Sequence, residues 1–143
     1  MNTKAIPTAV AAAVAGGLTL FLMGFIFYVL LLADFFDSSV AKDPLDFPFI
    51  VLGEVVWGGL LVWIFSRAGI STLADGAKAG AVFGFLAALA FGFIMYGATT
   101  VAYLSYYLAD SVVWAIRYAV AGAVVGWSLG GWASGAGKQS EPA

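Results

Sequence analysis

The chain of 143 residues is 63% hydrophobic and only 10% charged. A soluble domain of this size carries roughly 25% charged residues, so this composition excludes an ordinary soluble protein. The absence of His and Cys excludes His-bound haem, thiolate metal centres, disulfides, Cys nucleophiles and Ser-His hydrolysis. The net charge of -2 gives no basis for a nucleic-acid partner.

The hydrophobic residues form four long runs, and a helix needs about 20 apolar residues to cross a bilayer. The sequence therefore predicts an all-α integral membrane protein, a four-transmembrane-helix bundle over residues 1–131. The first run is longer than the ~7–15 apolar residues of a signal peptide, so we expect an uncleaved span. Residues 132–143 are predicted to form a disordered polar tail. The predicted spans are 5–33, 49–66, 77–98 (with a helical pattern that extends to 108) and 110–131.

Basic residues predict the orientation, because cytoplasmic loops of membrane proteins carry an excess of Lys and Arg. The side that holds both termini and the second loop carries Lys4, Arg67, Lys78 and Lys138, whereas the opposite side carries only Lys42. We therefore expect both termini in the cytoplasm and the first loop outside.

The first loop is acidic, which raises the question of a divalent cation site. The spacing of its carboxylates matches no standard calcium loop, so a solvated loop without a metal is expected. The acidic residues are Asp34, Asp37, Asp43 and Asp46.

The two halves of the chain share sequence patterns. Gly-Phe-Ile-x-Tyr occurs at residues 24–28 and 92–96, and Val-Val-Trp occurs at 55–57 and 112–114. Since the first and third spans run in the same direction, these matches predict two related helical hairpins in a parallel repeat. The alternative is a chance alignment of small apolar residues.

Small residues recur along the third and fourth spans. In lipid there is little hydrophobic drive between helices, so close backbone contact through such stripes favours association. The stripes suit either a dimerisation face or packing within one chain. Packing within the chain is favoured for the third span, and both roles stay open for the fourth. The helix-packing glycines are Gly76, Gly80, Gly84, Gly92, Gly122, Gly126 and Gly130.

Two opposite charges lie inside the predicted spans. Glu54 and Arg117 each lie roughly 10 Å from the outer end of their span, at 1.5 Å per residue. An Arg in mid-membrane costs about 2.5–3.5 kcal/mol on insertion scales, which favours a pair, with Asp110 as the competing partner of Arg117. A pair that fixes helix register, or Arg117 reaching outward, is favoured over a transport or proton-relay role.

Hydroxyl groups extend this polar region if the third helix continues past residue 98. Five residues then follow the spacing of one helix face: Tyr96, Thr99, Thr100, Tyr103 and Tyr107. With Tyr28 and the ionisable residues they could line a pocket or a water-filled vestibule. Interfacial tyrosines and hydroxyls bonded to their own helix are favoured. The candidate intramembrane polar cluster comprises Glu54, Arg117, Asp110, Tyr28, Tyr96, Thr99, Thr100 and Tyr103.

One segment carries several short motifs. It contains an apolar helix with Glu-x-x-Trp at 54–57, an Ile-Ser-Thr turn at 70–72, Lys-Ala-Gly at 78–80 and Met-Tyr-Gly at 95–97. With these motifs, segment 52–97 resembles a group of small four-span bacterial membrane proteins that have no assigned activity. The resemblance implies a location in the bacterial inner membrane and implies no mechanism.

The functional expectation is a non-enzymatic membrane protein with a structural or accessory role. It would lie in the lipid bilayer and either self-associate or join a larger membrane complex. The alternative is a small transporter or channel subunit that uses Glu54 and Arg117. An enzyme is least favoured because the chain has few catalytic groups, and no cofactor, metal or nucleic-acid partner is expected.

Overall fold

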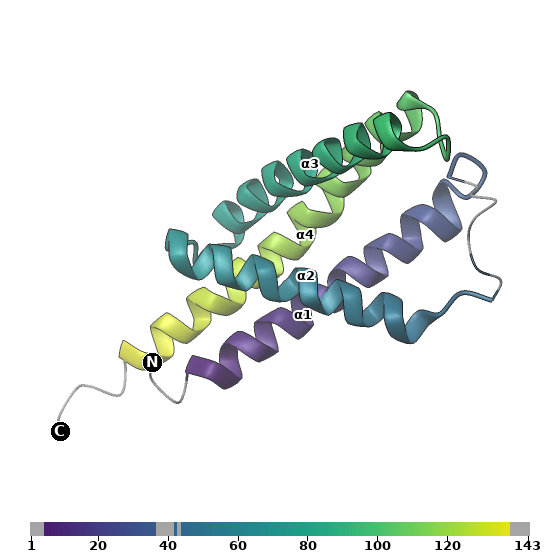
Figure 1. Cartoon of the computed structure of the whole chain (residues 1–143). Coiled ribbons are helices and arrows are strands. Elements are labelled where there is room, and N and C mark those ends of the chain that lie inside the picture. Colours follow the sequence, from purple (N-terminus) through teal and green to yellow (C-terminus); the bar gives the residue numbers. More distant parts are fainter. Residues whose placement is uncertain (1–4, 37–41, 43, 138–143) are drawn as a thin grey trace, which may run out of the picture.

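The computed structural model describes residues 5–36, 42 and 44–137, and its secondary structure is helical (Figure 1). The first helix continues without interruption into a short π-helical segment. The elements are α1 (Ala5–Phe25), η1 (Ile26–Leu31), α2 (Phe47–Ala68), α3 (Leu73–Ala98) and α4 (Leu104–Gly137).

Four segments are long and apolar enough to cross a membrane. Large apolar side chains such as Leu22, Val56 and Ile94 are exposed on the outside of the bundle, as lipid-facing side chains are. The predicted four-helix membrane bundle is confirmed, and by these spans the chain is a multi-pass membrane protein. The spans are Ile6–Leu31, Phe47–Ala68, Leu73–Ala98 and Leu104–Gly131.

Local sequence explains the turn between α2 and α3. Gly69 follows α2 with a φ of 69°, the left-handed conformation that glycine adopts without steric cost. The N–H of Ile70 then donates to the carbonyl of Phe65 at 3.0 Å. Thr72 is the N-cap residue of α3. Its Oγ1 accepts a hydrogen bond from the N–H of Asp75 at 3.1 Å, which is the usual role of Thr at an N-cap.

The third helix ends at Ala98, so the helical pattern does not continue to residue 108. Its 26 residues already measure about 39 Å at 1.5 Å per residue. Thr99 has an extended backbone, and its hydroxyl accepts a hydrogen bond from the N–H of Val101 at 3.4 Å. The chain turns there, and α4 begins at Leu104, earlier than the predicted 110.

At its other end, α4 continues past the predicted start of the polar tail. The helix includes residues 132–137, and residues 138–143 lie outside the described part of the chain. Extending an existing helix fixes one residue per hydrogen bond, whereas starting a new one is costly. A long span can therefore extend into a sequence of small residues.

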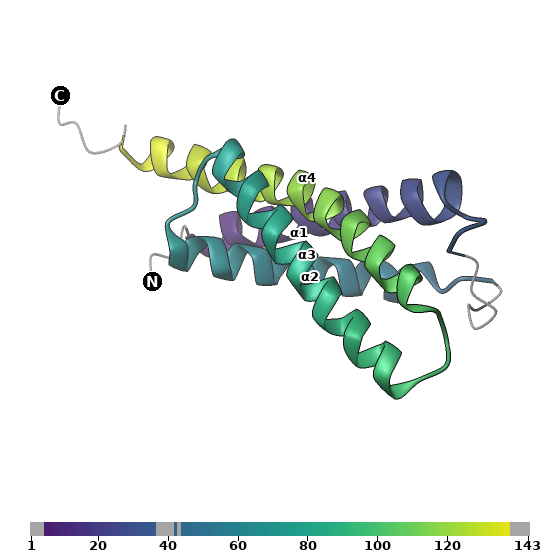
Figure 2. The same cartoon turned by 90° about the horizontal axis from the view of Figure 1, so that it is seen from above.

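The bundle consists of two helical hairpins, α1 with α2 and α3 with α4, and α1 also packs against α4. The turn at 69–72 lies at the same end of the bundle as the start of α1 and the end of α4 (Figures 1 and 2). The end of η1, the start of α2 and the connection at 99–103 lie at the other end. The principal interfaces do not include α2 with α3. These two helices are consecutive in the chain but belong to different hairpins.

Glycines bring α3 and α4 into backbone contact. A Cβ atom at Gly80 would lie 2.0 Å from the carbonyl oxygen of Tyr118, and one at Gly122 would lie 2.2 Å from that of Gly76. The glycine stripes of α3 and α4 therefore pack within the chain. Most of their glycines face the other helix, and the last ones on α4 face the turn before α3. Gly92 faces the Tyr107 side chain, and the other six predicted helix-packing glycines approach backbone atoms: Gly76, Gly80, Gly84, Gly122, Gly126 and Gly130.

A second glycine contact joins α1 to α2, and sequence analysis did not identify it. A Cβ at Gly58 would lie 2.2 Å from the carbonyl oxygen of Ala13, and one at Gly17 would lie 2.5 Å from the Cα of Val55. The two hairpins thus use the same means of close approach, which suits helices that associate in lipid.

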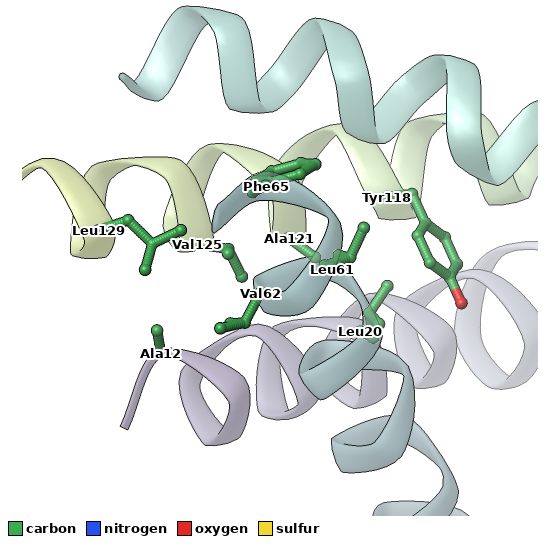
Figure 3. Packing of buried hydrophobic residues seen from close by; sticks show 9 residues of the cluster. All are labelled: Ala12, Leu20, Leu61, Val62, Phe65, Tyr118, Ala121, Val125 and Leu129. Atoms are coloured by element: carbon green, nitrogen blue, oxygen red, sulfur yellow. The ribbon is translucent and has the colours of Figure 1, made fainter. Parts of the chain in front are cut away.

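The core lies where α1, α2 and α4 meet (Figure 3). Leu20, Leu61 and Val125 are completely buried. The cluster is apolar apart from the Tyr118 hydroxyl, and it occupies the part of the bundle nearer the termini. Its members are Ala12, Leu20, Leu61, Val62, Phe65, Tyr118, Ala121, Val125 and Leu129.

Gly80→Ala should weaken the α3–α4 hairpin. The new methyl group would meet a backbone oxygen that cannot move without shifting the helix, and overpacking of this kind costs about 1–3 kcal/mol. Unfolding in mixed micelles, followed by circular dichroism, measures the loss. Gly59→Ala is the matched control because a Cβ there meets no atom of another helix within 4 Å. Equal unfolding midpoints for the two variants would contradict the glycine contact.

Candidate functional site

An ion pair connects three helices inside the spans. Nη2 of Arg117 on α4 donates one hydrogen bond to Oε1 of Glu54 on α2 and another, at 2.9 Å, to the carbonyl oxygen of Leu20 on α1. Arg117 is only 4% exposed, so its side chain lies inside the bundle instead of extending outward. A single guanidinium group therefore fixes α1, α2 and α4 relative to one another.

Aromatic rings and a glycine shape the space around Arg117. Its Cζ lies 5.3 Å from the ring centroid of Tyr28 and 5.9 Å from that of Trp114, distances at which a cation and a π-system attract. A Cβ at Gly24 would lie 2.9 Å from Nη2 of Arg117. Gly24 therefore leaves the room that the guanidinium occupies.

Asp110 has a different partner. The Tyr28 hydroxyl donates a hydrogen bond to the Asp110 carboxylate, while Arg117 pairs with Glu54. The site thus contains two acidic groups and one basic group, each acid with its own donor. Asp110 and Arg117 lie two turns apart on α4, which explains why sequence spacing alone could not choose between Glu54 and Asp110.

The π-helical segment η1 carries Tyr28. At its end, the N–H of Leu32 donates to the carbonyl of Phe27 at 2.8 Å, a five-residue separation typical of π-helices, which occur frequently at functional sites. Phe36, after the end of η1, is buried. Its ring centroid lies 5.1 Å from that of Tyr28 and 4.9 Å from that of Tyr106. The Phe36 ring therefore covers part of the Tyr28 ring near the first loop.

Four predicted members of the polar cluster do not join this site. Tyr96 and Tyr103 are exposed, and Thr100 is exposed. The Thr99 hydroxyl donates to the carbonyl of Met95 in the last turn of α3 at 2.8 Å. The predicted stripe assumed one continuous helix, but the chain turns after Ala98. In addition, α3 packs mainly on α4, whereas Tyr28 and Glu54 belong to the other hairpin.

A cavity of about 150 Å³ adjoins the ion pair. It lies between α1 and the first half of α2, and Arg117 reaches it from α4. Its walls are mostly apolar, with polar groups at one side. The apolar lining residues include Gly24, Phe25 and Phe47, and the polar ones are Tyr28, Glu54 and Arg117.

Sequence analysis missed several groups at this site. Gly24, Leu20 and Trp114 contact Arg117 directly. The spacing of Trp114 and Arg117, three residues apart on α4, would have placed both on one helix face. The Leu20 contact uses a backbone carbonyl, so no side-chain pattern could have indicated it.

The structure gives no support for a metal site in the part of the chain that it describes. No three acidic side chains come together among residues 5–36, 42 and 44–137. In the acidic first loop, Lys42 and Asp46 form an exposed ion pair of 3.9 Å. Asp37 and Asp43 lie outside the described residues.

Comparisons with protein-family models, curated proteins and solved structures give no match. The fold and the site together define the class of the molecule as a four-span helical membrane protein with a buried Arg–Glu pair.

Glu54→Gln and Arg117→Gln should each destabilise the bundle by about 3–5 kcal/mol, because each leaves a buried charge without its partner. The double variant should recover much of this loss, since it removes both charges. Unfolding free energies in mixed micelles give the coupling energy. Arg67→Gln is the control, because Arg67 is exposed at the end of α2. Additive losses would contradict a coupled pair.

Proposed function

We propose that this protein has a non-enzymatic, structural or accessory role in a bacterial inner membrane. The observation that carries the proposal is the position of Arg117, whose guanidinium bonds to α1 and α2 and has its Cζ 5.3 Å and 5.9 Å from two aromatic ring centroids. A charge used in this way sets the register of a bundle. The best-established use of buried polar groups is such a register role.

The apolar core supports a structural role over transport. Leu61 and Val125 are completely buried. They lie about two helical turns past Glu54 on α2 and past Arg117 on α4, toward the end of the bundle that carries the termini. A conduction pathway for ions needs polar groups or water along its length. Transport stays the alternative because a cavity adjoins the ion pair.

The glycine stripes bear on the choice between self-association and a larger complex. Gly80 and Gly122 are occupied by contacts within the chain, so these two glycines are not available for a dimer contact. This favours attachment to a larger membrane complex through other lipid-facing residues. The absence of His and Cys supports a non-enzymatic role.

The basic residues support an orientation with both termini in the cytoplasm. Arg67 and Lys78 flank the 69–72 turn at the end of the bundle that also holds the helical termini, as the excess of basic residues in cytoplasmic loops requires. Lys4 and Lys138 lie outside the described residues. The resemblance of segment 52–97 supports a bacterial inner membrane.

Purified protein in proteoliposomes should move neither protons nor monovalent cations faster than protein-free vesicles do. The physical reason is the apolar core on one side of the ion pair. Pyranine fluorescence and ion-selective dyes measure the flux. A flux that Glu54→Gln abolishes, and that the exposed-residue control Arg67→Gln retains, would establish the transporter alternative instead.

Because the chain has no Cys, single cysteines can report the orientation. Ser71 and Thr100 are exposed at opposite ends of the bundle. In intact spheroplasts, a membrane-impermeant maleimide should label Thr100→Cys, whereas Ser71→Cys should react only after permeabilisation. The reverse pattern would place both termini outside.

A further inference from the structure

The cavity beside the ion pair has the size of one six-membered ring. Its volume of about 150 Å³ matches that of an engineered protein cavity of roughly 150 Å³ that binds benzene. Aromatic side chains line it, among them Phe21 and Phe25 on α1, Tyr28 on η1 and Phe47 on α2. Such walls suit a flat ring, because aromatic groups pack favourably at offset or edge geometries.

The two sides of the cavity differ in polarity. Glu54 and Arg117 form its polar side, and both lie well inside the bundle. Phe25, Leu45 and Phe47 line the cavity and are also exposed on the outside of the bundle. A molecule with a polar ring and an apolar tail could therefore enter from the lipid with its tail remaining among lipid chains.

The charges of the site favour a neutral head that accepts hydrogen bonds. Arg117 and Glu54 neutralise each other, so the pair gives no net electrostatic attraction to an anionic or a cationic head. Within the described residues, both hydrogen bonds that Arg117 donates come from Nη2. Its buried Nε has no hydrogen-bond partner there. A guanidinium group has five N–H donors, so it can also serve a carbonyl oxygen of a ligand.

We propose that this cavity binds the head group of a lipid-soluble quinone. The ring would lie among the aromatic side chains, a carbonyl oxygen would accept a hydrogen bond from Arg117, and the tail would pass Phe25 and Phe47 into the lipid. The proposal concerns binding alone and goes beyond the structural role of the Glu54–Arg117 pair.

Binding can be measured with the full chain in phospholipid nanodiscs and a benzoquinone that carries a ten-carbon tail. Trp114 lies beside Arg117, so a quinone in the cavity should quench tryptophan fluorescence. Wild-type protein should show a saturable component above the linear quenching caused by quinone dissolved in the lipid. Decanol at the same concentration should not remove it.

Two variants enlarge side chains that line the cavity without changing its charges, Val29→Phe and Ile50→Phe. Like the control position Val56, both residues are exposed on the outside of the bundle, so the variants differ from the control in lining the cavity. Each should weaken the saturable component at least tenfold. Val56→Phe is the matched control: it makes the same kind of change at an exposed position that does not line the cavity, and it should bind like the wild type. Unfolding midpoints close to the wild-type value show that a variant is folded.

Three outcomes would overturn the proposal. The first is quenching of the wild type that rises linearly without saturation. The second is equal saturable binding in the folded cavity-filling variants and in Val56→Phe. The third is full displacement by decanol, which would show that the cavity takes any tailed lipid instead of a quinone ring.

Discussion

The bundle depends on the need to hold one guanidinium group inside an apolar environment. On insertion scales, an Arg near the membrane centre costs about 2.5–3.5 kcal/mol, and Arg117 offsets this cost through groups on other helices. Glu54 supplies the opposite charge, Leu20 supplies a backbone carbonyl, and Gly24 supplies the space. These contacts require α1, α2 and α4 to meet at one depth, so the position of one side chain constrains three helices.

Close backbone contact provides the second constraint. Because lipid offers little hydrophobic drive between helices, each hairpin relies on glycine. Gly58 packs against the backbone carbonyl of Ala13 in the first hairpin, and Gly80 packs against that of Tyr118 in the second. The glycine contacts set the distance within each hairpin, and the ion pair with the core residues sets the position of one hairpin against the other. The cavity follows from this arrangement, since α1 and α2 diverge from the core toward the first loop.

Much of the architecture could be predicted from the sequence, because span length and small-residue spacing are local properties. Which acid would pair with Arg117 could not be decided, since Asp110 has suitable spacing on the same helix while Glu54 lies on another. The prediction that the hydroxyl residues share one helix face was wrong. Their spacing in the sequence is regular, but the helix ends at Ala98, within the stripe. Periodicity reports spacing along the chain, so it cannot tell that Tyr103 lies in a turn.

The Arg117–Glu54 contact can be measured directly in lipid by solid-state NMR. Dipolar recoupling between ¹⁵N in the guanidinium groups and ¹³C in the carboxyl groups would report which acid lies beside Arg117. We expect a strong correlation between Arg117 and the Glu54 carboxyl that disappears in Glu54→Gln, with Asp110 giving a weaker one. A dominant Arg117–Asp110 correlation, or no carboxyl correlation for Arg117, would contradict the central role of this pair.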